Sequence, residues 1–235
     1  MKEESAETIY TSVDKVWPDN NRWYDYTHQN IIRFVERSLQ PLLCESSIYL
    51  NAGSGGSTYN LRGKCIHVDI AENLISMFPD YVVASIESLP FSENTFDATV
   101  CVGSVLNYCD AVKSITELSR TLKAGGYLVL EFERSNTGEL LGTKEYGKGA
   151  TLQHYEYMGH THTLFLYSER VILQLLRDCG LQLIKRKRYH NMSAIANRIT
   201  GHEEASGRFG RLDPLFAPVS YFTAHNMILL CRKLL

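Results

Sequence analysis

A glycine-rich turn and an aspartate have the types and spacing that could bind a nucleoside. Residues 48–57 (IYLNAGSGGS) pass from an apolar run into the turn, and Asp69 ends the next apolar run, residues 65–68. Gly53 and Gly55 let a ligand lie directly against the backbone. The Asp69 carboxylate can accept hydrogen bonds from both hydroxyls of a ribose. We therefore expect a strand, this turn and a following helix to form a nucleoside-cofactor site.

The spacing of the glycines opposes a dinucleotide. The fingerprint G-x-G-x-x-G would need a third glycine where this chain has Thr58. That glycine allows the helix to pack closely on the strand, and a β-branched residue does not. An NAD-dependent enzyme is therefore an alternative that Thr58 disfavours.

The turn opens an ordered series of segments. Residues 82–91 (VVASIESLPF), 96–108 (FDATVCVGSVLNY) and 122–133 (LKAGGYLVLEFE) follow it. Over residues 48–133 this series resembles the class I S-adenosylmethionine-dependent methyltransferases. The resemblance implies a doubly wound, Rossmann-like α/β fold: a seven-stranded, mostly parallel sheet with an antiparallel last strand and helices on both faces. It also implies S-adenosylmethionine as cofactor.

The same resemblance indicates the cofactor-binding residues, with two departures from the family pattern. Asn51 replaces the usual acid after the first strand; its amide can order the glycine turn but brings no negative charge near the sulfonium. Ser85 replaces the usual aspartate that contacts the adenine amino group. Ile86 would contact the adenine ring, and Glu87 could accept from the amino group in place of the aspartate. The expected set is Asn51, Gly53, Ser54, Gly55, Asp69, Ile70, Ser85, Ile86, Glu87, Gly103 and Ser104.

The catalytic end is indicated by two segments. In the family, the segment matching residues 103–108 lies beside the transferred methyl group, and Tyr108 could orient an acceptor or serve as packing. Enzymes that methylate the amino groups of nucleobases carry a [D/N]-P-P-[Y/F] motif in this segment. Residues 103–108 lack it, which argues against methylation of a base amine. Residues 153–167 alternate like a hairpin with Gly159 at its turn, and we expect His154 and His160 as candidate general bases. A metal site and an exposed polar face are the alternatives; we expect no metal.

Apolar periodicity predicts the elements that position these residues. We expect residues 1–47 to form an amino-terminal helical cap and residues 48–235 the methyltransferase domain, with residues 134–167 as a substrate-side insertion. Aromatic residues near position 20 could close over the cofactor or dock on the core. We expect helices at residues 31–43, 111–122 and 168–180, a loop at 135–149, and strands at 48–51, 65–69, 81–84, 98–102, 127–132, 181–189 and 226–232.

Composition limits the function. The chain has 235 residues, a formal charge of −2 and six scattered cysteines without metal-binding spacing. It shows no signal peptide and no apolar run long enough to span a bilayer, so we expect a cytoplasmic protein without membrane insertion. The net negative charge disfavours binding of DNA and other long nucleic acids. The basic run 185–188 either forms a solvent-exposed strand face or binds an acidic group of the acceptor.

We therefore expect an enzyme that transfers a methyl group from S-adenosylmethionine to an oxygen or nitrogen atom of a small molecule, such as a sugar, glycoconjugate or secondary metabolite. Two alternatives share the fold. One is an RNA or protein methyltransferase, and the other is a non-catalytic, cofactor-binding partner of an active subunit.

Overall fold

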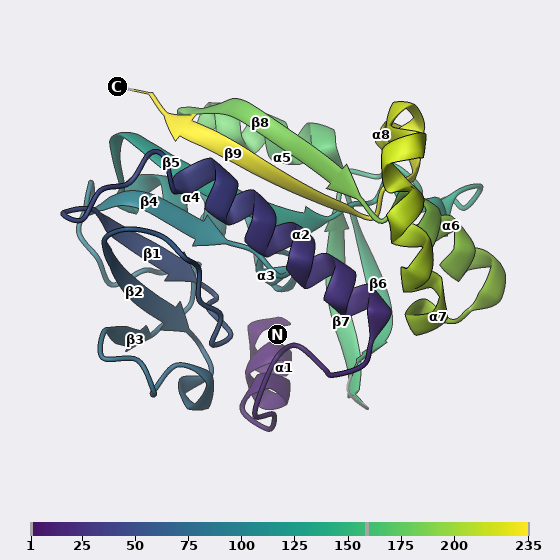
Figure 1. Cartoon of the computed structure of the whole chain (residues 1–235), viewed down its shortest axis with the longest axis horizontal. Coiled ribbons are helices and arrows are strands. Elements are labelled where there is room, and N and C mark those ends of the chain that lie inside the picture. Colours follow the sequence, from purple (N-terminus) through teal and green to yellow (C-terminus); the bar gives the residue numbers. More distant parts are fainter. Residues whose placement is uncertain (1, 158–159, 235) are drawn as a thin grey trace.

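A seven-stranded sheet forms the centre of the molecule in the computed structural model, which describes residues 2–157 and 160–234. The strand order is β3-β2-β1-β4-β5-β9-β8 (Figure 1). Strands β1 to β5 pair in parallel, and β9 is antiparallel to both its neighbours. The predicted sheet is confirmed. Its strands are β1 (Ile48–Ala52), β2 (Lys64–Asp69), β3 (Tyr81–Val83), β4 (Phe96–Cys101), β5 (Leu122–Glu133), β8 (Leu181–Tyr189) and β9 (Asn226–Lys233).

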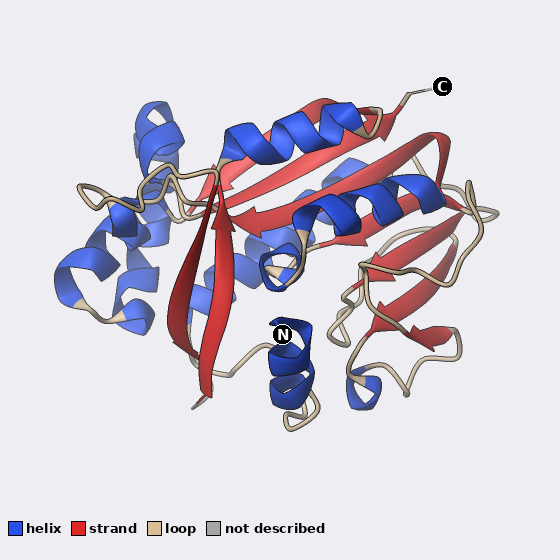
Figure 2. Cartoon of the chain, turned by 180° about the vertical axis from the view of Figure 1, so that it is seen from behind, coloured by secondary structure: helices blue, strands red, loops and turns tan. Residues whose placement is uncertain are grey.

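Helices cover both faces of this sheet (Figures 1 and 2). The described helices are α1 (Lys2–Tyr10), α2 (Arg22–Leu39), α3 (Val105–Tyr108), α4 (Ala111–Thr121), α5 (Glu169–Asp178), α6 (Asn191–Thr200), α7 (Glu203–Gly207) and α8 (Ser220–Thr223), with 3₁₀ segments η1 (Glu72–Leu74), η2 (Gly138–Leu140) and η3 (Arg208–Val219). Phe34 and Val35 of α2 pack on one face. Ile115 of α4 and Ile172 of α5 pack on the other. Of these helices, none combines the length and apolar character that a bilayer-spanning segment requires.

Side-chain caps explain where the longest helices begin. The Asn21 side chain accepts hydrogen bonds from the backbone N–H groups of Trp23 and Tyr24, so α2 begins at Arg22, well before the predicted residue 31. Its first two turns are mixed polar and aromatic, and the apolar periodicity therefore shows only its second half. Asp110 caps α4 in the same way. Strand β5 begins directly after α4, at Leu122.

The helix predicted after the glycine turn is wrong. Residues 57–63, between β1 and β2, are irregular, and only η1 lies between β2 and β3. Gly53, Gly55, Gly56 and Gly63 all have positive φ, and such a run of left-handed residues in a short connection prevents a helix. Instead, Tyr59 packs with α2 against the sheet.

Two further units lie beyond the carboxyl ends of β4 and β5 (Figures 1 and 2). The predicted hairpin is present as β6 (Ala150–Tyr157) and β7 (His160–Tyr167), paired antiparallel. The proposed turn at Gly159 lies outside the described residues. The segment from α6 to α8, between β8 and β9, is helical and was not predicted. The loop predicted at 135–149 begins with buried residues, and η2 packs against α6.

Candidate cofactor and acceptor site

A pocket lies at the carboxyl ends of the parallel strands, where the amino-terminal segment adds Tyr10, Trp17 and Trp23 to its lining. Most of the predicted cofactor residues line it. Asn51, Ser85, Glu87 and His154 do not, and the side chain of His160 lies outside the described residues. The predicted residues in the lining are Gly53, Ser54, Gly55, Asp69, Ile70, Ile86, Gly103, Ser104 and Tyr108.

Asp69 organises the glycine turn at one end of the pocket. Its Oδ2 accepts a hydrogen bond from Gly55 N–H at 2.8 Å, and its Oδ1 accepts one from Ala71 N–H at 3.0 Å. Burial raises the pKa of this carboxyl, and the backbone N–H donors act in the opposite direction. Each carboxylate oxygen has a second lone pair, so the group can still accept bonds from ligand hydroxyls.

Gly53 must lack a side chain at this turn. Its φ is +67°, and a Cβ atom built there would lie 2.4 Å from Cγ2 of Val105. The turn therefore presents backbone to the pocket next to the Asp69 carboxylate. This combination can hold a ribose and the chain attached to it.

Asn51 lies behind the turn, not in the pocket lining. Its Nδ2 donates to Ser54 Oγ at 3.1 Å and to the backbone carbonyl of Ser57 at 2.8 Å. The side chain is buried. An amide is suited to this position because it must donate to a carbonyl oxygen, and a carboxylate cannot.

Restoring the family acid with Asn51→Asp should therefore destabilise the protein. The change removes both donors and places a buried charge against the Ser57 carbonyl, at an expected loss of about 1–3 kcal/mol in the free energy of unfolding. Urea denaturation of Asn51→Asp and of the exposed control Asn60→Asp measures this loss. An Asn51→Asp protein as stable as the control would contradict the role of the amide.

Ser85 and Glu87 take part in local structure. Ser85 Oγ accepts from Glu87 N–H at 3.0 Å. Glu87 accepts from the backbone N–H of Asp110 at the start of α4 and pairs with Lys113 at 3.6 Å. Of the three residues predicted around an adenine ring, only Ile86 lines the pocket.

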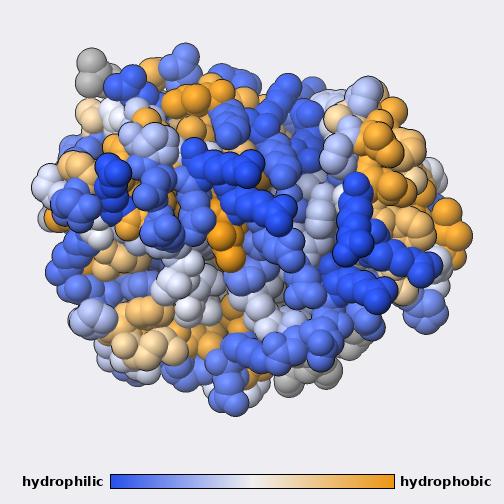
Figure 3. Space-filling view, viewed as in Figure 1, coloured by the Kyte–Doolittle hydropathy of each residue, from blue (hydrophilic) through white to orange (hydrophobic). Residues whose placement is uncertain are grey.

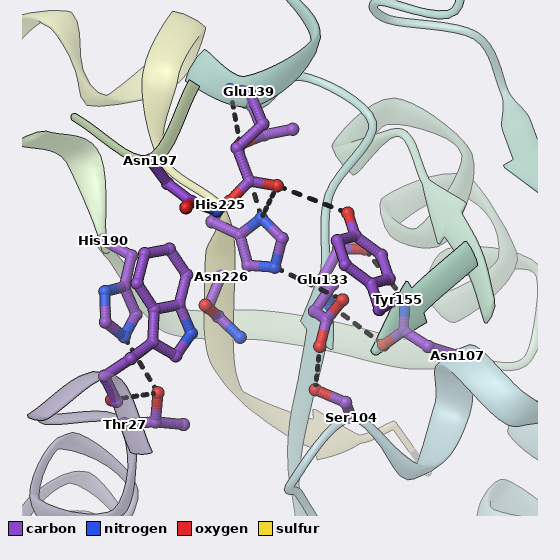
Figure 4. A network of polar contacts seen from close by, with 12 residues as sticks. Thr27, Ser104, Asn107, Glu133, Glu139, Tyr155, His190, Asn197, His225 and Asn226 are labelled. Atoms are coloured by element: carbon purple, nitrogen blue, oxygen red, sulfur yellow. Dashed lines mark hydrogen bonds and ion pairs between the residues drawn. The ribbon is translucent and has the colours of Figure 1, made fainter. Parts of the chain in front are cut away.

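At the other end of the pocket, a buried histidine lies between two carboxylates (Figure 4). His225 Nε2 is 3.3 Å from Glu133 Oε2, and its Nδ1 is 3.3 Å from Glu139 Oε2. Burial lowers the pKa of His225, but the two carboxylates outweigh it and hold the pKa well above the usual value. His225 is therefore an imidazolium whose charge is already neutralised by its partners.

Both carboxylates are further engaged. Glu133 Oε1 accepts from Ser104 Oγ at 2.7 Å, and Glu139 accepts from Tyr155 Oη at 3.3 Å and from Asn197 Nδ2 at 3.1 Å (Figure 4). The amide of Asn107 brackets the backbone of Glu133, donating to its carbonyl at 3.0 Å and accepting from its N–H at 2.9 Å. The network is thus held in one arrangement.

Glu203, on α7, adds a third carboxylate to this end of the pocket. Burial raises its pKa to about 7, and the negative charges of Glu139 and Glu133 act in the same direction, while a hydrogen bond with Tyr24 opposes them. Glu203 therefore changes protonation near neutral pH. Neither Glu203, Glu133 nor His225 was predicted; the position of Glu133 at the end of an apolar strand was the one available signal.

Tyr108 contacts the hairpin through His162, which was not among the histidines predicted as general bases. Its hydroxyl lies 2.7 Å from His162 Nδ1 and 3.1 Å from the Tyr10 hydroxyl. His162 is buried and lines the pocket, whereas His154 is exposed and lies 3.0 Å from Thr163 Oγ1. Among the side chains that the structure describes, no group of three or more histidine, cysteine, aspartate or glutamate residues is arranged so that it could hold a metal ion.

Comparison with known proteins agrees with this geometry. Residues 49–130 match the family described as methyltransferase domain. The chain is 28% identical over 127 residues to a ubiquinone/menaquinone biosynthesis C-methyltransferase of Pasteurella multocida, covering 49% of this chain and 46% of that protein. It spans less than half the length of the first curated relatives that it matches.

Solved structures share the fold at low sequence identity. A geranyl diphosphate C-methyltransferase from Streptomyces coelicolor superposes with a TM-score of 0.65 at 11% identity, covering 99% of this chain and 98% of that one. A 1,6-didemethyltoxoflavin-N1-methyltransferase from Burkholderia thailandensis gives 0.58 at 13% identity, covering 100% and 91%. Residues 49–130 thus match a methyltransferase domain, and the solved structures share the fold of the chain.

Proposed function

We propose that the pocket binds S-adenosylmethionine and transfers its methyl group to a nitrogen or oxygen atom of a small molecule held beside Glu203. The observation that carries this proposal is one pocket that joins the glycine and Asp69 turn to an end lined with carboxylates and aromatic rings. The cofactor supplies a methyl group on a sulfonium, which is already activated for displacement. The protein must therefore place the acceptor in line and remove its proton.

The turn fits a nucleoside that carries no pyrophosphate. Gly53 and Gly55 present backbone, Asp69 presents a carboxylate, and Ile70 and Ile86 offer apolar contacts for a base. A dinucleotide site would direct a helix amino terminus at the pyrophosphate, and residues 57–63 contain no helix. This supports S-adenosylmethionine over NAD.

The acceptor end favours an uncharged or cationic substrate. Glu133 and Glu203 bring negative charge, and no lysine or arginine occurs among the described residues that line the pocket. The charge of His225 is met by its two carboxylates. An amine or a hydroxyl compound suits this environment, and a phosphate does not. The pocket therefore does not suit a diphosphate such as the substrate of the Streptomyces enzyme.

Glu203 is the candidate general base because its raised pKa matches a neutral working pH. S-adenosylmethionine, held by the glycine turn and Asp69, would supply the methyl carbon and keep the electron pair of the broken carbon–sulfur bond as the acceptor atom bonds to that carbon. The acceptor's proton passes to the Glu203 carboxylate. Glu133 and Glu139 are less suited because each is bonded to His225 and to further donors.

Calorimetry and methyl labelling test this function in two steps. We expect S-adenosylmethionine and its demethylated product to bind, and NAD not to bind. Incubation of the protein with methyl-labelled cofactor and cell extract should then label a small molecule. NAD binding without S-adenosylmethionine binding would contradict the cofactor assignment. Label in RNA or protein, or cofactor binding without any transfer, would instead favour the corresponding alternative.

A further inference from the structure

Large apolar side chains project into solvent from the segment between α6 and α8. Ile199 is 78% exposed, Leu215 75% and Phe222 55%. Figure 3 shows apolar surface gathered on the side of the molecule where α8 lies, bordered by strongly hydrophilic residues. We call this patch the η3–α8 surface; it consists of Ile199, Leu212, Leu215, Phe216, Val219 and Phe222.

This segment is firmly anchored, so the exposure does not come from a loose end. Asp213 is buried, with Oδ1 accepting from Asn191 N–H at 2.9 Å and Oδ2 accepting from Tyr26 Oη at 3.1 Å. The buried guanidinium of Arg134 donates to the carbonyls of Ser220 and Ala224 at 3.1 and 3.0 Å. The hydrogen bonds of Asp213 and Arg134 fix the backbone of this segment, and the apolar side chains between these anchor points face solvent.

Cations lie beside the apolar residues. Arg22, Arg208 and Arg211 line one surface hollow together with Asp25 and neighbouring residues of α2. Arg208 and Arg211 belong to η3 itself, and Arg211 directly precedes Leu212. Within the described part of the chain, none of these three guanidinium groups forms an ion pair. With three arginines and one aspartate, the hollow has a net positive charge, and it adjoins the protruding apolar groups of η3.

We propose that the η3–α8 surface docks the protein on an anionic lipid bilayer. Projecting leucine and phenylalanine side chains can enter the boundary between headgroups and acyl chains, while arginines bind lipid phosphates. A second copy of the chain would bring the same arginines and so lacks complementary charge. Such docking is peripheral and needs no membrane-spanning helix. It is independent of the proposed methyl transfer.

Vesicle sedimentation tests this docking with the full chain. We expect binding to vesicles of phosphatidylcholine and phosphatidylglycerol in equal parts, and much less to phosphatidylcholine alone. Leu215→Asp with Phe222→Asp should weaken binding by roughly 10-fold or more, because two apolar side chains no longer enter the bilayer. Arg208→Glu with Arg211→Glu should abolish the preference for the anionic vesicles.

Matched variants and a lipid-free measurement complete the test. Met77→Asp with Val112→Asp also replaces two exposed apolar side chains, at 65% and 56% exposure, on other elements, and should leave vesicle binding unchanged. Cofactor affinity and circular dichroism confirm that each variant is folded. Absence of binding to anionic vesicles would overturn the proposal. So would a dimer in lipid-free ultracentrifugation that Leu215→Asp with Phe222→Asp dissociates, since a second copy would then cover the surface.

Discussion

Replacing Glu203 by glutamine should lower the single-turnover rate of methyl transfer by roughly 10²–10⁴-fold, the usual effect of removing a general base. Glutamine keeps the shape and the hydrogen bonding of the side chain but cannot take up a proton. Because Glu203 lies at the acceptor end of the pocket, the affinity for S-adenosylmethionine should change little. The neighbouring Glu204→Gln is the matched control, since Glu204 is exposed and does not line the pocket.

The pH dependence separates a base from a packing residue. The pKa of Glu203 is raised to about 7, so below that pH its carboxyl is protonated and cannot accept the acceptor's proton. The wild-type rate should therefore fall as the pH drops below about 7 and level off above it. Glu203→Gln should lose this limb of the profile. A wild-type rate, or an unchanged limb, in the glutamine variant would rule out the base assignment.

The centre of the sheet was predictable because β1, β4 and β9 are buried nearly throughout and read as nearly continuous apolar runs. The helices were less so. The start of α2 depends on the Asn21 cap, and its first turns do not repeat in an apolar pattern. The absent helix after β1 follows from backbone conformations at Gly55, Gly56 and Gly63 that a periodicity argument does not consider.

The two ends of the pocket also differ in how well the sequence predicts their residues. The cofactor end is built from strand ends, where a short motif brings its residues together, and most predicted residues line the pocket there. The acceptor end joins Glu133 at the end of β5, Glu203 on α7 and His225 before β9, which are distant in the sequence. Nothing in a polar run such as residues 202–204 indicates that one glutamate points into a pocket. Alternation located the hairpin but did not determine which histidine faces inward.

Asp69→Ala should weaken S-adenosylmethionine binding by roughly 10²-fold, and more if the turn also loosens. The carboxylate is expected to accept a charge-assisted pair of hydrogen bonds from the ribose, worth about 1.5–3 kcal/mol. It also accepts from the N–H groups of Gly55 and Ala71, so its removal leaves the turn without its organising group.

Asp69→Asn separates these two contributions. The amide keeps one oxygen that can accept from Gly55 or Ala71, yet it carries no charge and offers the ribose fewer acceptors. We expect its affinity to lie between those of wild type and Asp69→Ala, with turnover falling only as cofactor occupancy falls. Calorimetry for affinity and single-turnover kinetics at saturating cofactor measure both, with Asn60→Asp as a control outside the pocket. Wild-type affinity in Asp69→Ala would show that this carboxylate does not hold the ribose, and the cofactor would then have to bind elsewhere in the pocket.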